Sequence, residues 1–149
     1  MSCPQQRPKR NRARHKAREL VLQGLYQWHI SEDSITQIES QFLSRNDMSK
    51  VDGPFFHDLL LGVARKVDEL DRLFSPFLDR PLEQIDPVER AALRLGCYEL
   101  TARHDIPYRI VINESIELTK RFGAQDSHKY INGILDKLAA QCRMEEVKA

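Results

Sequence analysis

The sequence has few cysteines and no long hydrophobic run. Cys3, Cys97 and Cys142 are widely spaced and odd in number, so they do not indicate a disulfide framework, and they favour the reducing cytoplasm. No apolar stretch approaches the roughly 20 residues that a membrane-spanning helix needs, and none of the signal-peptide type follows the basic N-terminal residues. We therefore expect a cytoplasmic protein that makes no contact with a membrane.

The sequence also lacks the common signatures of catalysis and cofactor binding. It contains no nucleotide-binding motif of the G-x-G-x-x-G or P-loop type and no G-x-S-x-G nucleophile motif. Its five histidines show no H-E-x-x-H arrangement, and Cys97 and Cys142 have no Cys or His neighbour at metal-ligand spacing. We therefore predict a protein that is not an enzyme and has no metal site or cofactor.

Acidic residues are absent from the start of the chain. The first 18 residues hold seven Lys or Arg and no Asp or Glu, although the whole chain has 23 basic and 22 acidic residues. The remainder of the chain is therefore acidic. A concentrated basic segment on an acidic body indicates a phosphate-rich partner, most often nucleic acid. The alternative is a solvated charge run without a ligand.

The apolar residues recur with helical spacing throughout, and no segment alternates as a strand would. We expect an all-α fold, a single compact helical domain over residues 1–149 with a flexible basic arm at about residues 1–11. Asp86-Pro87 is a typical helix start and Gly123 a typical helix end, whereas the polar tail from Arg143 is expected to fray. Six helices are predicted, at about residues 12–28, 35–43, 54–74, 87–100, 112–122 and 127–142.

Four glycines lie inside predicted helices, where each costs about 1 kcal/mol relative to alanine. They are Gly24, Gly62, Gly96 and Gly133. The cost indicates close helix–helix contacts at these positions, although a glycine that is merely tolerated is the simpler alternative.

The first predicted helix carries a candidate RNA-binding surface. Arg12, Lys16 and Tyr26 project away from its apolar stripe, and Arg14 and Arg18 flank that stripe. An exposed tyrosine beside cations is typical of single-stranded RNA binding, in which cations hold phosphates and the ring stacks on an unpaired base. An ordinary surface tyrosine beside solvated charges is the alternative.

The start of the last predicted helix is a second candidate surface. Asp126 or Ser127 is expected to cap it, and Lys129 and Tyr130 place a cation and an aromatic ring in the first turn. The free N–H groups of a helix start can also hold phosphate. Core packing of Tyr130 and a solvated Lys129 are the alternative interpretation.

Four segments carry a family resemblance. They are RHKARELVLQGLY at 14–26, VERAALRLGCYEL at 88–100, IP at 106–107 followed by INESIEL at 112–118, and FGAQDSHKYINGILD at 122–136. Each is a degenerate helical pattern by itself. Together, in this order and at this spacing, they resemble the NusB family of bacterial transcription antitermination factors over nearly the whole chain.

The resemblance implies an all-α fold of two packed three-helix bundles and no catalysis. It also implies a partner, NusE, a small ribosomal-subunit protein that doubles as a transcription factor. The pair is expected to bind the single-stranded boxA element of ribosomal RNA leaders. It is then expected to join other Nus factors on RNA polymerase, so that the polymerase reads through terminators in rRNA operons.

The resemblance also implies which residues bind RNA. His15 stands where the family often has arginine, and Tyr130 where phenylalanine is common. Arg12 and Lys129 are added from the helix geometry described above. The residues implied by the resemblance are Arg14, His15, Lys16, Arg18, Tyr26, Glu89, Asp126 and Tyr130.

Several alternatives stay open at the level of sequence. The chain could be an accessory module of an rRNA methyltransferase, or a protein-interaction scaffold whose basic head meets an acidic protein. The free protein could be a monomer or a homodimer. The sequence assigns neither the RNA bases that are read nor the surface that docks NusE, and it gives Arg7, Lys9 and Arg10 no defined role.

Overall fold

The computed structural model describes residues 6–149, with side chains from residue 9 onward, so that Cys3 and the side chain of Arg7 lie outside it. Every regular element in the described part is helical, which confirms the all-α prediction. The chain divides into two compact units, the first ending at Ala64 and the second running from Arg65 to Ala149. Their helices are α1 (Gln6–Ile30), α2 (Ile35–Arg45) and α3 (Gly53–Arg65), then α4 (Val67–Phe74), α5 (Pro87–Ala102), α6 (Tyr108–Phe122), α7 (Ser127–Cys142) and α8 (Met144–Lys148), with 3-10 turns η1 (Ser75–Phe77) and η2 (Leu82–Gln84).

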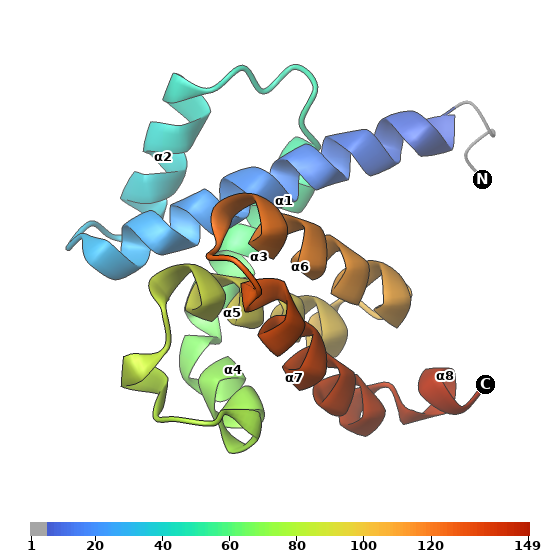
Figure 1. The fold of residues 1–149 in the computed structure, drawn as a ribbon. Helices are drawn as coiled ribbons and strands as arrows, with labels where there is room; N and C mark the ends of the chain where they lie inside the picture. The colour runs from blue at the N-terminus through green and yellow to red at the C-terminus, as the bar shows by residue number, and fades with distance from the viewer. Residues whose placement is uncertain (1–5) are drawn as a thin grey trace. The chain divides into compact units, whose positions relative to one another are not determined.

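The first unit is built around the long helix α1. A Cβ added to Gly24 would lie 3.1 Å from Leu60 of α3 and 3.6 Å from Ile38 of α2, so glycine allows both helices to approach α1 closely. Figure 1 shows α2 beside the C-terminal half of α1 and the connection after α2 returning to its N-terminal half. The amide of Asp52, at the end of that connection, donates to the carbonyl of Ala13 at 3.1 Å.

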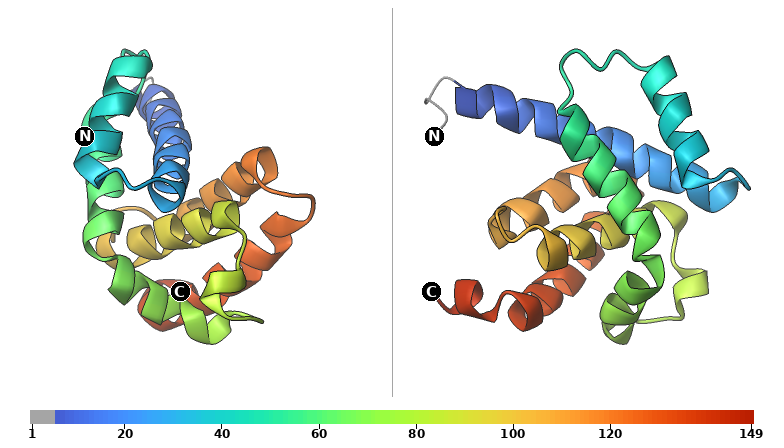
Figure 2. Two further views of the ribbon diagram at one scale, coloured as in Figure 1. Left: turned by 90° about the vertical axis from the view of Figure 1, so that its left-hand side faces the viewer. Right: turned by 180° about the vertical axis from the view of Figure 1, so that it is seen from behind.

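The second unit is built around α5, which contacts α4, α6 and α7. In Figure 2 the unit can be followed along the chain from green α4 to red α8. A Cβ at Gly96 would lie 2.9 Å from Leu135 of α7 and 3.0 Å from the Ser115 hydroxyl of α6. The predicted close contact is therefore confirmed at Gly96, as it is at Gly24. It is wrong at Gly133, where a Cβ would meet nothing within 4 Å.

Local signals set several helix boundaries as expected. The Asp86 carboxylate accepts hydrogen bonds from the amides of Val88 and Glu89, and Pro87 occupies the first turn of α5. Gly123 ends α6 in an extended conformation (φ −95°, ψ 179°), not in the left-handed one that such a glycine often adopts. Glycine is needed there because a Cβ would lie 2.8 Å from the carbonyl oxygen of Thr119.

The helix predicted over 54–74 is in fact two helices. Lys66 separates α3 from α4 with a non-helical backbone (φ −109°, ψ 17°). The apolar spacing runs on across this break, because Leu60 is buried on one side of it and Leu70 on the other. A periodic pattern does not reveal a break of one residue. The second unit therefore holds α4 and the short α8 in addition to α5, α6 and α7, the three helices that the prediction placed in one bundle.

The C-terminal tail was predicted to fray, but in the structure it is ordered. Arg143 is 4% exposed, and its guanidinium donates hydrogen bonds to carbonyl oxygens at and after the end of α5. It also contacts the Glu146 carboxylate at 2.6 Å, and that carboxylate accepts a hydrogen bond from the Tyr108 amide at 2.7 Å. These contacts hold α8 against the end of α5 and the start of α6. The sequence of the tail is polar and gives no sign of them.

The N-terminal end of α1 also differs from the prediction. The helix begins at Gln6, so that Lys9 and Arg10 are helical, whereas the flexible arm was expected to reach about residue 11. Packing of the units into a single domain stays a prediction.

Two of the three cysteines lie in the described part of the chain. Cys97 and Cys142 are free thiols, and burial raises the pKa of the Cys97 thiol to about 12. Among the described helices, none combines the length and apolarity needed to cross a bilayer.

Candidate nucleic-acid interface

The exposed side of α1 carries two cations and an aromatic ring, which we call the α1 surface: Arg12, Lys16 and Tyr26. Arg12 and Lys16 are exposed, and Tyr26 is 39% exposed. The helical rise of about 1.5 Å per residue places Tyr26 about 21 Å along the axis from Arg12, and the two are rotated by only about 40°. The cations and the ring therefore lie on one side of one rigid element.

Arg14 and Arg18 do not belong to this exposed surface. Their guanidinium groups lie 4.6 Å and 4.9 Å from the centroid of the Phe55 ring. Arg14 also contacts the Asp52 carboxylate at 3.4 Å, and Arg18 is only 3% exposed. Both arginines hold α1 against the start of α3. The expectation that Arg18 meets RNA directly is therefore not supported, because Phe55 and the surrounding core cover it.

His15 is only partly available to a ligand. Its Nε2 atom lies 3.6 Å from the Glu19 carboxylate, one turn further along α1, and its side chain is 38% exposed. The imidazole already has an acidic neighbour, so we expect a weaker phosphate contact here than from the exposed Arg12 or Lys16.

In the second unit, Asp79 and Arg80 hold the side chain of Tyr130 in place. We call these three residues the Tyr130 cluster, and the sequence did not predict it. The Tyr130 hydroxyl donates to the Asp79 carboxylate at 2.8 Å and accepts from the Asp79 amide at 3.2 Å. Arg80 binds the same carboxylate with two N–H groups at 2.9 Å and 3.0 Å. Its guanidinium lies 5.9 Å from the centroid of the Tyr130 ring. No sequence pattern relates Asp79 to a tyrosine so far along the chain.

Glu89 lies near this cluster and adds negative charge. The hydrogen bond to Asp79 and the charge of that carboxylate raise the pKa of the Arg80 guanidinium, and Glu89 contributes less. Two carboxylates and one guanidinium leave no excess of positive charge. The Tyr130 cluster is therefore better suited to hold a base than a phosphate, since carboxylates accept hydrogen bonds from base amino groups and aromatic rings stack.

Asp126 occupies the capping position of α7 but does not cap it. Its backbone is left-handed (φ 69°) and its side chain makes no capping hydrogen bond. The carboxylate instead lies 3.3 Å from the Lys129 ammonium, and both side chains are largely exposed. The position of the helix start was predicted correctly, but the role of its side chain was wrong. Lys129 is thus partly neutralised by its neighbour.

Replacing Tyr130 by phenylalanine is expected to raise the pKa of Asp79. That pKa is about 2, lowered from 3.8 by hydrogen bonds first from Arg80 and then from Tyr130. The ionised Asp79 carboxylate therefore contributes to stability at a pH above its pKa in the unfolded state, near 3.8. This contribution is lost as the pH falls through about 2. Loss of the hydroxyl should move the pKa part of the way back, because Arg80 remains. An NMR-monitored titration of the Asp79 carboxyl measures this, with Tyr26→Phe as the control. A pKa that stays near 2 in Tyr130→Phe would show that the hydroxyl bond is unimportant.

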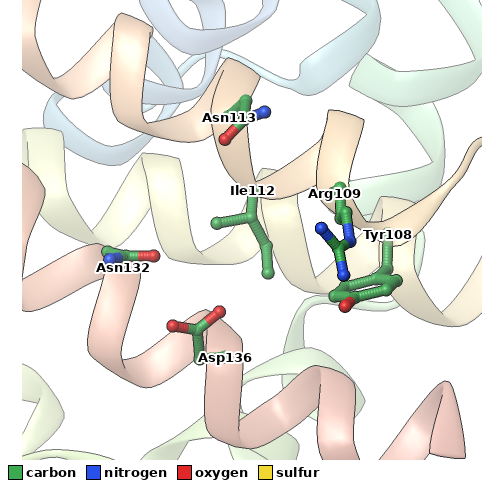
Figure 3. A pocket seen from close by; sticks show the side chains of 6 residues that line it. All are labelled: Tyr108, Arg109, Ile112, Asn113, Asn132 and Asp136. Carbon is green, nitrogen blue, oxygen red and sulfur yellow. The ribbon is translucent and has the colours of Figure 1, made fainter. Parts of the chain in front are cut away.

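A pocket of about 280 Å³ lies elsewhere in the second unit. Figure 3 shows it between α6 and α7, with Asn132 and Asp136 of α7 facing side chains of α6. Its lining carries one guanidinium, Arg109, and one carboxylate, Asp136, so it has no excess charge to hold a phosphate. None of the predicted site residues lines it. In the described part of the chain, no group of three His, Cys, Asp or Glu side chains could hold a metal ion.

The fold and these surfaces define an all-α protein that presents cations and accessible aromatic rings of the kind that contact nucleic acid. Residues 15–140 match the NusB family. The chain is 56% identical to the transcription antitermination protein NusB of Marinobacter nauticus over 135 residues, which are 91% of this chain and 85% of that protein. It is 55% identical to NusB of Alcanivorax borkumensis, over 90% of this chain and 89% of that protein. The chain therefore belongs to the NusB family.

Solved structures agree with this assignment. NusB of T. maritima superposes with a TM-score of 0.78 at 29% identity, over 91% of this chain and 96% of that one. A chain from a complex of the antitermination factors NusB and NusE with dsRNA superposes with a TM-score of 0.74 over 85% of this chain and 96% of that one. Its identity is 21%, so this second likeness concerns the fold alone.

Proposed function

We propose that this chain is a transcription antitermination factor without enzymatic activity. Together with NusE it binds the single-stranded boxA element of ribosomal RNA leader transcripts. With other Nus factors it then promotes read-through of rRNA operons by RNA polymerase. The observation that carries the RNA-binding part is the α1 surface, in which exposed cations and an exposed ring share one side of a helix. Family membership and the names of the relatives support the role in antitermination.

The α1 surface supplies two different contributions to RNA binding. Arg12 and Lys16 attract phosphates and release condensed counterions, which gives affinity without sequence preference. Tyr26 stacks on an unpaired base, and a base in a duplex is not available for such stacking. The proposed ligand is therefore single-stranded. Tyr130, with Lys129 beside it, offers a second ring to the same RNA.

A partner protein is expected because several of the cations predicted to bind RNA are engaged within this chain. Arg14 and Arg18 are engaged with Phe55, and Lys129 is paired with Asp126. A complex of NusB and NusE with dsRNA contains a chain whose fold this chain shares, and it supports NusE as that partner. NusE would extend the RNA-binding surface, so that the pair binds more tightly than either protein.

A transcription assay tests the proposed function. We expect that adding this chain and NusE to RNA polymerase with the other Nus factors increases full-length transcript from a template carrying an rRNA leader and a terminator. The matched control is the same template with its boxA sequence scrambled, on which the chain should have no effect. Equal read-through with and without the chain on the boxA template would refute the proposed function.

A further inference from the structure

A positively charged groove lies between the first turns of α1 and the connection between α2 and α3. It has a volume of about 480 Å³. Four of its seven lining residues are Lys or Arg, and they come from two separate elements. The lining consists of Lys9, Arg12, Ala13 and Lys16 from α1, and Ser49, Lys50 and Val51 from the connection.

The connection that carries Lys50 is held in place on both sides. Before it, the Asp47 carboxylate accepts a hydrogen bond from the Ser49 amide at 3.0 Å. After it, the Asp52 amide donates to the carbonyl of Ala13 in α1 at 3.1 Å, and the Asp52 carboxylate accepts from the Phe55 amide at 3.1 Å. Lys50 therefore lines the groove opposite α1 from a loop whose backbone is held by hydrogen bonds on both sides, so that little ordering of the backbone opposes binding of a ligand.

The cations of the groove are not neutralised by ion pairs. Among the described residues, no carboxylate lies within ion-pair distance of Lys9, Arg12, Lys16 or Lys50. One acid, Asp47, lies close enough to feel the charges of two of these cations. Hydrogen bonds from Ser49 lower its pKa first, and the charges of Lys50 and Lys16 lower it further. Four cations without an ion-pair partner give the groove an excess of positive charge.

We propose that this groove binds a phosphodiester group of the RNA backbone, and that Lys50 contacts the phosphate from the side opposite α1. A phosphate presents several oxygens in different directions, so it can be held by ammonium groups that converge from two elements. RNA is favoured over an acidic protein because Arg12 and Lys16 also belong to the α1 surface with Tyr26. The inference rests on the RNA binding in the proposed function, but it concerns a contact that does not depend on RNA sequence.

Replacing Lys50 by glutamine tests this proposal. Each phosphate contact on single-stranded nucleic acid contributes about −0.7 to the slope of log K against log salt concentration. Lys50→Gln should therefore reduce the steepness by about 0.7 and weaken binding about fivefold at 0.1 M salt, since the contribution grows by about 0.7 log units per decade below 1 M. Lys50→Arg should keep the slope and the affinity of the wild type, and Lys50→Glu should lose more affinity than Lys50→Gln. Fluorescence anisotropy with a labelled boxA RNA and with a scrambled RNA measures these changes.

The control is Lys137→Gln, which removes the same charge from an exposed position on α7. It should leave the slope unchanged. An unaltered slope in Lys50→Gln, or an equal loss in Lys137→Gln, would overturn the proposal. The effect of Lys50 should be the same on both RNAs. A wild-type chain that binds boxA and scrambled RNA equally, yet loses slope with Lys50→Gln, would support the phosphate site while contradicting the proposed boxA recognition. A wild-type chain that binds neither RNA would overturn both.

Discussion

Replacing Arg143 by methionine is expected to lower the free energy of unfolding of the second unit by about 2–6 kcal/mol, because each buried carbonyl oxygen left without a donor costs about 1–3 kcal/mol. The guanidinium donates to the carbonyl oxygens of Leu100 at 2.7 Å, Arg103 at 2.8 Å, Ile106 at 3.0 Å and Glu99 at 3.2 Å. The last carbonyls of a helix have no partner within it. Arg143 therefore completes the C-terminal end of α5. Methionine would remove the donor to the carbonyl oxygens of Leu100 and Ile106, whereas those of Glu99 and Arg103 would keep the amides of Arg103 and Ile106.

The effect should be local to the second unit and should include α8. Hydrogen exchange at the amides of α5 and α8, measured beside urea unfolding, separates loss of this unit from loss of the first one, which a single two-state fit would not do. The matched control is Arg72→Met, because Arg72 is exposed on α4 and has no hydrogen-bond or ion-pair partner among the described residues. Exchange protection in Arg143→Met equal to that in Arg72→Met would contradict the role given to Arg143.

Replacing Tyr26 by alanine is expected to weaken boxA RNA binding by about 1–3 kcal/mol, or about 5- to 150-fold in Kd. The physical reason is the loss of one stacked base, because Tyr26 is exposed and lies on the same side of α1 as Arg12. A stacking contact releases no counterion. The salt dependence should therefore be unchanged in Tyr26→Ala, whereas Lys16→Gln should reduce it by about 0.7 in slope.

Two further variants define the role of the ring. Tyr26→Phe keeps the aromatic face and should bind RNA nearly as tightly as the wild type. Gln23→Ala lies one turn earlier, where the glutamine is exposed and its side chain bonds only to the backbone carbonyl of Glu19. It should bind like the wild type and so controls for changes in the helix. Wild-type affinity in Tyr26→Ala would exclude stacking at this position.

Local sequence signals predicted most of the helices. The Asp86 cap, the proline after it and the apolar spacing of α5 each act within a few residues, so they can be read without a structure. The break at Lys66 could not be, because nothing in its neighbourhood interrupts the apolar pattern. The ordered conformation of the tail could not be predicted from the sequence either, since Arg143 is held by carbonyl groups about 40 residues earlier in the chain.

The candidate surfaces were predictable only where one helix determines exposure. Helical geometry placed Arg12, Lys16 and Tyr26 on the exposed side correctly. It could not show that Phe55 covers Arg18, nor that Lys50 faces α1 across a groove. Each of these contacts joins segments that are distant in sequence, and periodicity carries no information about them.

Recognition of boxA by the α1 surface is the central claim, and one titration tests it most directly. Labelled boxA RNA and a scrambled RNA of the same composition are titrated with the wild-type chain in the presence of NusE, at matched salt concentrations. The predicted result is tighter binding of boxA by about tenfold or more, the discrimination expected from one or more specific base contacts. Equal affinity for the two RNAs at every salt concentration would contradict the claim, because binding would then come from phosphate contacts alone.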